Sequence, residues 1–232
     1  MKFWKDKIFL KSMLSIAIPI ALQNLITSSL NMVDTLMISS LGESSIAAVG
    51  LANQVFFFYA LINFGINSGS SIFISQYWGR EDIFSIRKVL GLSVSLSTIT
   101  GIIFTLGAFF FPEFIMGIFI KEPEVVKLGA DYLRIVSLSY IITAIGFAYS
   151  IALRSTGRPK VPMMVSAISF ITNTVFNYLL IFGKFGFPQL GVKGAAWGTL
   201  IARIVEIIFI LYIVYSTNGP LAASPKELLD WN

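Results

Sequence analysis

Residues 12–33 read SMLSIAIPIALQNLITSSLNMV and contain no Asp, Glu, Lys or Arg. A helix needs about 20 mostly apolar residues to cross the hydrocarbon core of a bilayer, and this stretch is long enough. Beyond Asp34 the sequence is again apolar and small as far as Leu41. The stretch therefore predicts a first transmembrane helix over residues 12–41.

Further along the chain, more apolar stretches of this kind alternate with short joints rich in charge, Gly and Pro. Such joints are the usual ends of helices. The apolar runs are continuous rather than alternating, which favours helices over a transmembrane barrel. We therefore predict an all-α integral membrane protein whose residues 1–215 form a six-transmembrane-helix bundle. The predicted spans are about 12–41, 45–77, 89–111, 132–153, 161–183 and 194–215.

The composition agrees with a chain that is solvated by lipid. Charged residues make up 12% of the 232 residues, hydrophobic residues make up 56%, and the mean hydropathy is +0.80. The chain has neither Cys nor His, which excludes disulfides and removes the usual zinc and haem ligands. The net charge of +5 comes without a basic run. The expected partner is therefore the lipid bilayer and not nucleic acid.

Motifs of the common enzymes are missing from the sequence. There is no G-x-x-x-x-G-K-[ST], which argues against ATP hydrolysis by this chain. There is also no H-E-x-x-H and no G-x-S-x-G, so the parts of a hydrolase are lacking. We expect no enzymatic activity and no organic cofactor. Energy for any transport would come from an ion gradient.

Lys and Arg are distributed unevenly between the two sets of connections. One set holds eleven, namely Lys2, Lys5, Lys7, Lys11, Arg80, Arg87, Lys88, Arg154, Arg158, Lys160 and Lys226, and the other set holds four. The positive-inside rule places the richer set in the cytoplasm. We therefore predict a multi-pass protein of the cell membrane with both termini cytoplasmic. Residues 216–232 would form a cytoplasmic tail or a linker. Because the number of spans is even, a second copy of the six-helix unit fused there would enter the membrane in the same orientation as the first.

Polar residues inside the apolar spans mark where chemistry can occur, because lipid penalises them. Several recur at helical spacing and so share one face of their helix. Such faces should line the bundle interior or a water-filled cavity. Packing is the alternative for each residue, since Asn and Thr in membrane helices often only bond neighbouring helices. The residues that we predict for a small-molecule substrate cavity are Asn24, Asn31, Asn53, Asn63 and Asn67.

Asp34 is the strongest candidate for a functional group. A carboxylate about seven residues inside a span needs a functional or paired explanation. Counting about 1.5 Å per residue from the outer helix ends places Asn177 and Thr199 at a similar depth, with Asn173 one turn deeper. Together they offer carboxylate, amide and hydroxyl oxygens. Such ligands suit a hard monovalent cation such as Na+, and a lone carboxylate equally suits a proton.

Short motifs also resemble those of a known family. They are Ile18-Pro19 with Gln23-Asn24-Leu25, Met32-Val33-Asp34-Thr35, Gln76-Tyr77-Trp78-Gly79-Arg80-Glu81-Asp82, Leu153-Arg154-Ser155-Thr156-Gly157-Arg158-Pro159-Lys160, Asn173-x-x-x-Asn177-Tyr178 and Gly191-Val192-x-Gly194-Ala195-Ala196. Jointly they resemble the multidrug and toxic compound extrusion (MATE) transporters. The resemblance spans essentially the whole chain. Members of this family have two six-helix lobes, and the chain resembles the N-terminal one.

The resemblance implies a secondary antiporter that exports organic, often cationic, compounds in exchange for Na+ or H+. A second six-helix lobe, either a missing C-terminal half or a second copy, is then an expected partner. The family's cation site implies Asp34, Asn173 and Thr199 as ligands, together with a second Asp one turn after Asn173. This chain has Asn177 at that position. One negative charge instead of two weakens the expectation of Na+ and leaves H+ coupling through Asp34 open.

Two other functions stay open at this point. A lipid-linked saccharide flippase of the same superfamily should carry more basic residues within its spans, to hold a pyrophosphate. Arg203 alone is thin support for it, and Glu206, three residues later, is expected to pair with Arg203. A non-transporting membrane scaffold or half-subunit would tolerate the loss of Asp34.

Overall fold

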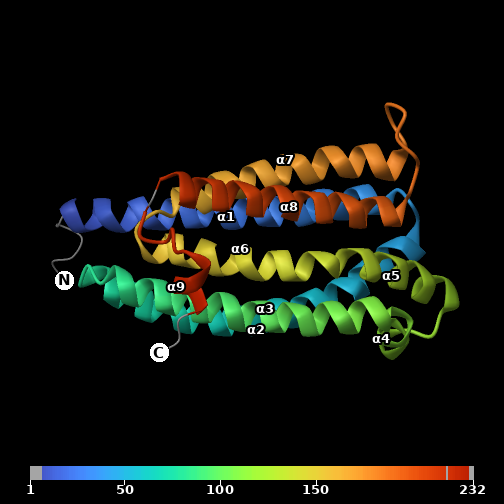
Figure 1. Ribbon diagram of the computed structural model, residues 1–232. Coiled ribbons are helices and arrows are strands. Elements are labelled where there is room, and N and C mark those ends of the chain that lie inside the picture. The colour runs from blue at the N-terminus through green and yellow to red at the C-terminus, as the bar shows by residue number, and fades with distance from the viewer. Residues whose placement is uncertain (1–6, 218, 230–232) are drawn as a thin grey trace, which may run out of the picture.

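The computed structural model describes residues 7–217 and 219–229, and every regular element in these ranges is a helix. Six helices are long and apolar enough to cross a membrane, which confirms the predicted fold class. They are α1 (Lys7–Ser39), α2 (Glu43–Gly79), α3 (Ile83–Phe110), α6 (Leu138–Ser155), α7 (Lys160–Phe182) and α8 (Val192–Ser216). Figure 1 shows these six side by side in one bundle. The shorter helices are α4 (Pro112–Phe119), α5 (Pro123–Val136) and α9 (Pro225–Leu229).

Helix α6 lies at the centre of this bundle, between α8 on one side and α2 and α3 on the other (Figure 1). It is the most enclosed span, since 50% of its most apolar window is buried, against 11% for α1. Its buried face includes Ala144, Ala148 and Ala152. Small side chains of this kind let neighbouring helices approach closely in a membrane, where packing replaces the hydrophobic effect.

The fourth span differs from the single helix predicted over 132–153. The chain turns at Ser137, which separates α5 from α6. The hydroxyls of Ser137 and Ser139 each bond back to a carbonyl about one turn earlier, at 2.9 Å and 2.6 Å. Thr105 of α3 donates to the carbonyl of Ser137 at 2.8 Å. Side chains that take over helix carbonyls in this way bend a helix, and α5 packs instead between α2 and α8.

The C-terminal segment is docked against the bundle. Helix α9 packs on α3, and Arg87 of α3 both donates to Pro220 O at 3.1 Å and pairs with Glu227 at 2.6 Å. Tyr215 donates to Ala223 O at 2.7 Å. Figure 1 shows α9 at the end of the bundle where α1 begins. The described part of the predicted tail or linker therefore has structure of its own.

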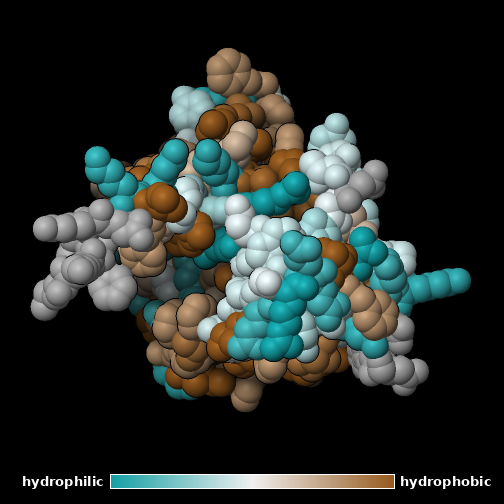
Figure 2. All heavy atoms as spheres, turned by 90° about the vertical axis from the view of Figure 1, so that its left-hand side faces the viewer, coloured by the Kyte–Doolittle hydropathy of each residue, from teal (hydrophilic) through white to brown (hydrophobic). Residues whose placement is uncertain are grey.

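The surface separates into a polar end and apolar flanks. Figure 2 looks onto the end where α1 begins and shows hydrophilic side chains over much of this face, with hydrophobic ones toward its edges. Along the flanks, large side chains such as Phe57, Ile103 and Phe110 are exposed. An apolar flank of this kind is what a chain surrounded by lipid presents.

Candidate functional site

The predicted coupling residues come from three helices and meet in one hydrogen-bonded chain. Asn177 of α7 donates from Nδ2 to Asp34 Oδ1 of α1 at 2.7 Å and to Asn173 Oδ1 at 3.0 Å. Asn173 Nδ2 lies 3.4 Å from Thr199 Oγ1 of α8. The structure thus brings together all four residues that the sequence selected by depth.

Close packing of α7 against α8 holds the two amides in place. Asn173 and Asn177 are buried, while Asp34 is half-buried at the edge of the cluster. Gly198 of α8 makes this approach possible, because a Cβ there would collide with the Asn177 side chain. Gly194, one turn earlier, lies equally close to the backbone of α7. The GxxxG spacing in α8 is therefore a packing surface for the site.

This cluster contains a single carboxylate. Within residues 7–217 and 219–229, no group of three or more His, Cys, Asp or Glu side chains could hold a metal ion. Asp34 Oδ1 already accepts from Asn177, and Oδ2 receives no hydrogen bond from a described residue. The Asn177 Oδ1 atom is buried and also lacks a partner there. Oxygens left open in this way can accept a proton or one bond from a hard cation.

A second polar cluster lies next to the first. Arg203 and Glu206 form the predicted pair, at 2.7 Å, and Ser169 lies 3.4 Å from Glu206 Oε2. Arg203 is also near enough to Asp34 for the two charges to attract each other. Tyr132 of α5, which the sequence reading did not select, lies against Thr199. The charge of Asp34 is therefore felt by Arg203 on α8.

A cavity of about 530 Å³ lies between α1, α2, α6, α7 and α8. This size is within the range of small-molecule sites. Of the five Asn residues predicted for a substrate cavity, Asn24 belongs to the lining, whereas Asn31 and Asn53 are exposed on helix surfaces elsewhere. The polar and charged residues of the lining include Gln23, Asn24, Arg154, Ser166, Arg203 and Glu206.

The other two predicted cavity residues are buried on α2, and one of them, Asn67, contacts α3. Asn67 donates to Ser97 at 3.0 Å and accepts from Ser93 at 2.8 Å, and Asn63 donates to Tyr59 O at 3.1 Å. Helix α2 turns this face toward α3 and not toward α1. Asn63 and Asn67 are therefore buried and do not line this cavity.

The whole arrangement can be compared with known proteins. A model of the MatE family matches residues 19–179, which is more than half of the chain. The chain belongs to the MATE family. The probable multidrug resistance protein NorM of Thermotoga maritima is 29% identical over 94% of this chain, and the probable multidrug resistance protein YoeA of Bacillus subtilis is 29% identical over 91% of it.

A solved MATE structure shares the fold. The outward-facing form of a multidrug resistance MATE family transporter superposes with a TM-score of 0.84 and 24% identity over 94% of this chain. The chain spans about half the length of the relatives that it matches, with 49% of NorM, 46% of YoeA and 48% of the solved transporter covered. This coverage corresponds to one six-helix lobe of a MATE transporter.

Sequence reasoning missed two cavity residues of this MATE chain. From the sequence, Arg154 was considered only in the count of positive charges in the connections. In the structure α6 continues to Ser155, and Arg154 Nη2 donates to Gln23 Oε1 at 2.7 Å. Gln23 Nε2 donates in turn to Ser166 Oγ at 2.8 Å. Gln23 stands one turn before Thr27, another polar residue of the first span, so helical spacing could have found it. No comparable signal marks Arg154.

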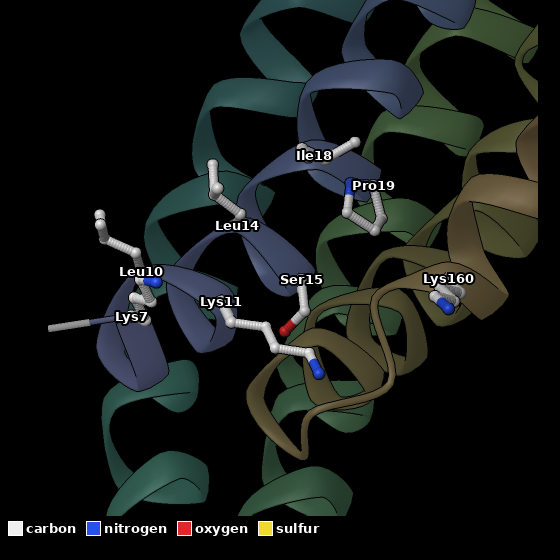
Figure 3. Close-up of a pocket in the computed structure, with 8 residues that line it drawn as sticks. All are labelled: Lys7, Leu10, Lys11, Leu14, Ser15, Ile18, Pro19 and Lys160. Carbon is white, nitrogen blue, oxygen red and sulfur yellow. The ribbon is translucent and has the colours of Figure 1, made fainter.

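A second hollow lies away from these clusters, along the start of α1. It measures about 540 Å³, and Figure 3 shows Lys7 and Lys11 on α1 with Lys160 at the start of α7. Its other lining residues are mostly apolar, and none is acidic. Along the helix, Lys11 is about 35 Å from Asp34 at 1.5 Å per residue. This groove is therefore separate from the Asp34 cluster.

Proposed function

We propose that this MATE chain is one lobe of a secondary active antiporter that exports organic compounds in exchange for an ion bound at Asp34. The observation that carries the proposal is the 2.7 Å hydrogen bond from Asn177 Nδ2 to Asp34 Oδ1, which ties a carboxylate within the spans to a neighbouring helix. Such carboxylates are costly and mark ion pathways. The multidrug resistance names of two relatives support organic compounds as the exported class.

Ion binding at Asp34 would act through the contact between α1 and α7. The ionised carboxylate accepts the Asn177 N–H, and this hydrogen bond holds α1 against α7. Protonation or cation binding removes this charge, so α1 is freed to shift. Two features suit α1 to movement. Only 11% of its apolar window is buried, and Pro19 interrupts its backbone hydrogen bonds.

The geometry favours H+ over Na+ as the coupling ion. Asn177 Nδ2 faces two acceptor oxygens, those of Asp34 and Asn173, so its N–H side is turned toward the carboxylate. A Na+ ion bound to the Asp34 carboxylate would need an oxygen ligand where the Asn177 N–H now lies. Turning the Asn177 amide to supply that oxygen would break both of its hydrogen bonds. One proton, in contrast, neutralises the single carboxylate without rearranging the amide.

The proposal includes a second lobe and an orientation. Alternating access in two-lobe transporters requires both lobes around a central site, so a C-terminal half or a second copy completes this chain. The end that carries Lys11, Lys160 and Lys226 is the more basic one and is placed in the cytoplasm. The Asp34 cluster then lies in the outer half of the cell membrane.

The two alternatives have less support. A flippase needs several cations for a pyrophosphate, and the cavity holds two arginines, of which Arg203 is neutralised by Glu206. A scaffold without transport gives no reason for the hydrogen-bonded network around Asp34.

Gradient-driven flux tests the proposal. Proteoliposomes containing the complete two-lobe transporter, or a dimer of this chain, should expel a fluorescent rhodamine with a free benzoate when a pH gradient is imposed. A protonophore should abolish this flux. Flux that ignores both proton and sodium gradients would contradict antiport. Flux by a demonstrably monomeric 232-residue chain would contradict the need for a second lobe.

A further inference from the structure

Arg154 is a cation on the cavity lining without a counter-ion. Among the described residues its guanidinium makes one hydrogen bond, from Nη2 to Gln23 Oε1 at 2.7 Å, and no carboxylate lies within ion-pair distance. Its Nε is buried and has no partner there. The other arginine of the lining, Arg203, is paired with Glu206 at 2.7 Å. Arg154 lies in the last turn of α6, and a charge that is partly buried normally has a partner, so its isolation calls for an explanation.

The guanidinium is held in place by a neutral group, which leaves its charge available. Gln23 donates from Nε2 to Ser166 Oγ at 2.8 Å, and this bond fixes the amide so that Oε1 faces Arg154. The chain of contacts joins α6, α1 and α7. Arg154 is therefore oriented in advance, and a ligand would not have to order a long flexible side chain.

The charges of the lining add up to one positive charge at Arg154. Arg154, Arg203 and Glu206 are its charged residues, and the last two neutralise each other. Aromatic side chains such as Phe56, Phe64 and Phe147 form other parts of the lining. A chamber with aromatic walls, hydroxyl and amide groups and one unpaired cation matches an amphipathic compound that carries a single anionic group on an aromatic or aliphatic body.

We infer that Arg154 is an anion subsite within the transport cavity, which binds the carboxylate or another small oxyanion of the exported compound. A guanidinium suits this role because its planar fork can hold two oxygens at once. This inference rests on the proposed transport function and narrows its substrate class. The favoured compounds are zwitterions and organic anions, in place of purely cationic drugs.

A matched pair of dyes tests the subsite directly. The first is a rhodamine with a free benzoate and the second is the methyl ester of the same dye, so both share one cationic ring system. Their binding to the full chain in phosphatidylcholine nanodiscs is followed by fluorescence polarisation. Charge-assisted hydrogen bonds should make the acid bind about tenfold tighter than the ester.

Variants then assign the preference to this side chain. Arg154→Gln should weaken acid binding by about tenfold and leave ester binding unchanged. Arg154→Lys should keep most of the preference because it keeps the charge. Arg158→Gln serves as the matched control, since Arg158 is exposed and bonds Thr217 outside the cavity, and it should change neither affinity.

Three results would overturn the inference. They are equal binding of acid and ester, no binding of the acid, and an equal loss of both dyes in Arg154→Gln, which would make Arg154 a structural residue. If a complete two-lobe transporter does not prefer the acid over the ester, the inference is overturned as well. A carboxylate of the second lobe would then be the partner of Arg154. The dye assay needs no gradient and no Asp34 chemistry, so its failure is distinct from a failure of antiport.

Discussion

Asn177 donates its side-chain amide to Asp34 at 2.7 Å, although the two residues are 143 positions apart in the chain. This contact joins α1 to α7 through a single carboxylate. The strength of this contact between α1 and α7 depends on the charge of Asp34, so changes at either residue should have measurable effects.

Replacing the carboxylate should separate coupling from folding. Asp34→Asn should abolish gradient-driven export by the complete transporter, because an amide cannot release and bind the coupling ion. Folding should be nearly unaffected, since the amide has the same shape and costs less to bury. Proteoliposome flux and thermal unfolding measure the two effects. Asp131→Asn is the control, because Asp131 pairs with Lys193 away from the cluster and should leave flux unchanged. Normal uphill export by Asp34→Asn would mean that the polar residues around Asp34 serve only helix packing.

Restoring a second carboxylate should change the ion. Asn177→Asp replaces an N–H donor beside Asp34 with oxygens, which a hard cation prefers. The variant should therefore gain Na+ dependence of flux, and Na+ should raise its thermal stability in detergent through binding to the folded state. K+ at the same concentration is the control salt. If Na+ has no effect on flux or unfolding, the cluster does not select its ion through the residue at position 177.

The sequence predicted the six membrane spans better than the contacts between them. Charge-free stretches are enough to place six spans, because lipid imposes that pattern on any helix. The turn at Ser137 escaped prediction because it depends on a hydroxyl from Thr105, which is distant in sequence. Depth brought Asp34 and Asn177 together correctly. It could not show which face of α2 meets α3, and so Asn67 was expected in the cavity, although it bonds Ser93 and Ser97 of α3. Rotation of a helix about its axis is fixed by packing and not by spacing.

Close packing around the coupling cluster should be sensitive to one methyl group. A Cβ at Gly198 would collide with Asn177, so Gly198→Ala should destabilise the fold by about 1–3 kcal/mol. It should also displace the Asn177 amide and lower coupled flux. Gly107→Ala is the matched control, since nothing lies near a Cβ there. Thermal unfolding of both variants is the measurement, and equal stability would show that α8 can shift to accommodate the methyl group.

Docking of the C-terminal segment should depend on pH. A backbone N–H from Ser224, followed by the Arg87 side chain, holds the pKa of Glu227 below its ordinary value of 4.5. A lowered pKa means that the contact contributes fully above 4.5 and is lost as the pH falls through the lower folded-state value. A spin label at Lys226→Cys should therefore be immobile at neutral pH and become mobile in strong acid.

A neutral side chain should reproduce this release without acid. Glu227→Gln should make the same spin label mobile at neutral pH, because the Arg87 pair is lost. Glu81→Gln is the control, because Glu81 lies in the joint before α3, the helix on which α9 packs, and has no ion pair among the described residues. It should leave the label immobile. A label that stays immobile in Glu227→Gln would mean that the apolar contacts of Leu221 and Leu228 hold the segment unaided.

Orientation in the membrane can be measured cleanly because the chain has no native Cys. Single Lys5→Cys, Glu122→Cys and Lys226→Cys variants each report on one position. Glu122 lies in the joint between α4 and α5, at the end of the bundle opposite α9 (Figure 1). The basic residues concentrate at the α9 end, so this end should stay in the cytoplasm. A membrane-impermeant maleimide should therefore label Glu122→Cys in intact cells and reach the other two only after permeabilisation. Labelling of Lys5→Cys in intact cells would reverse the topology and would move the Asp34 cluster to the inner half of the membrane.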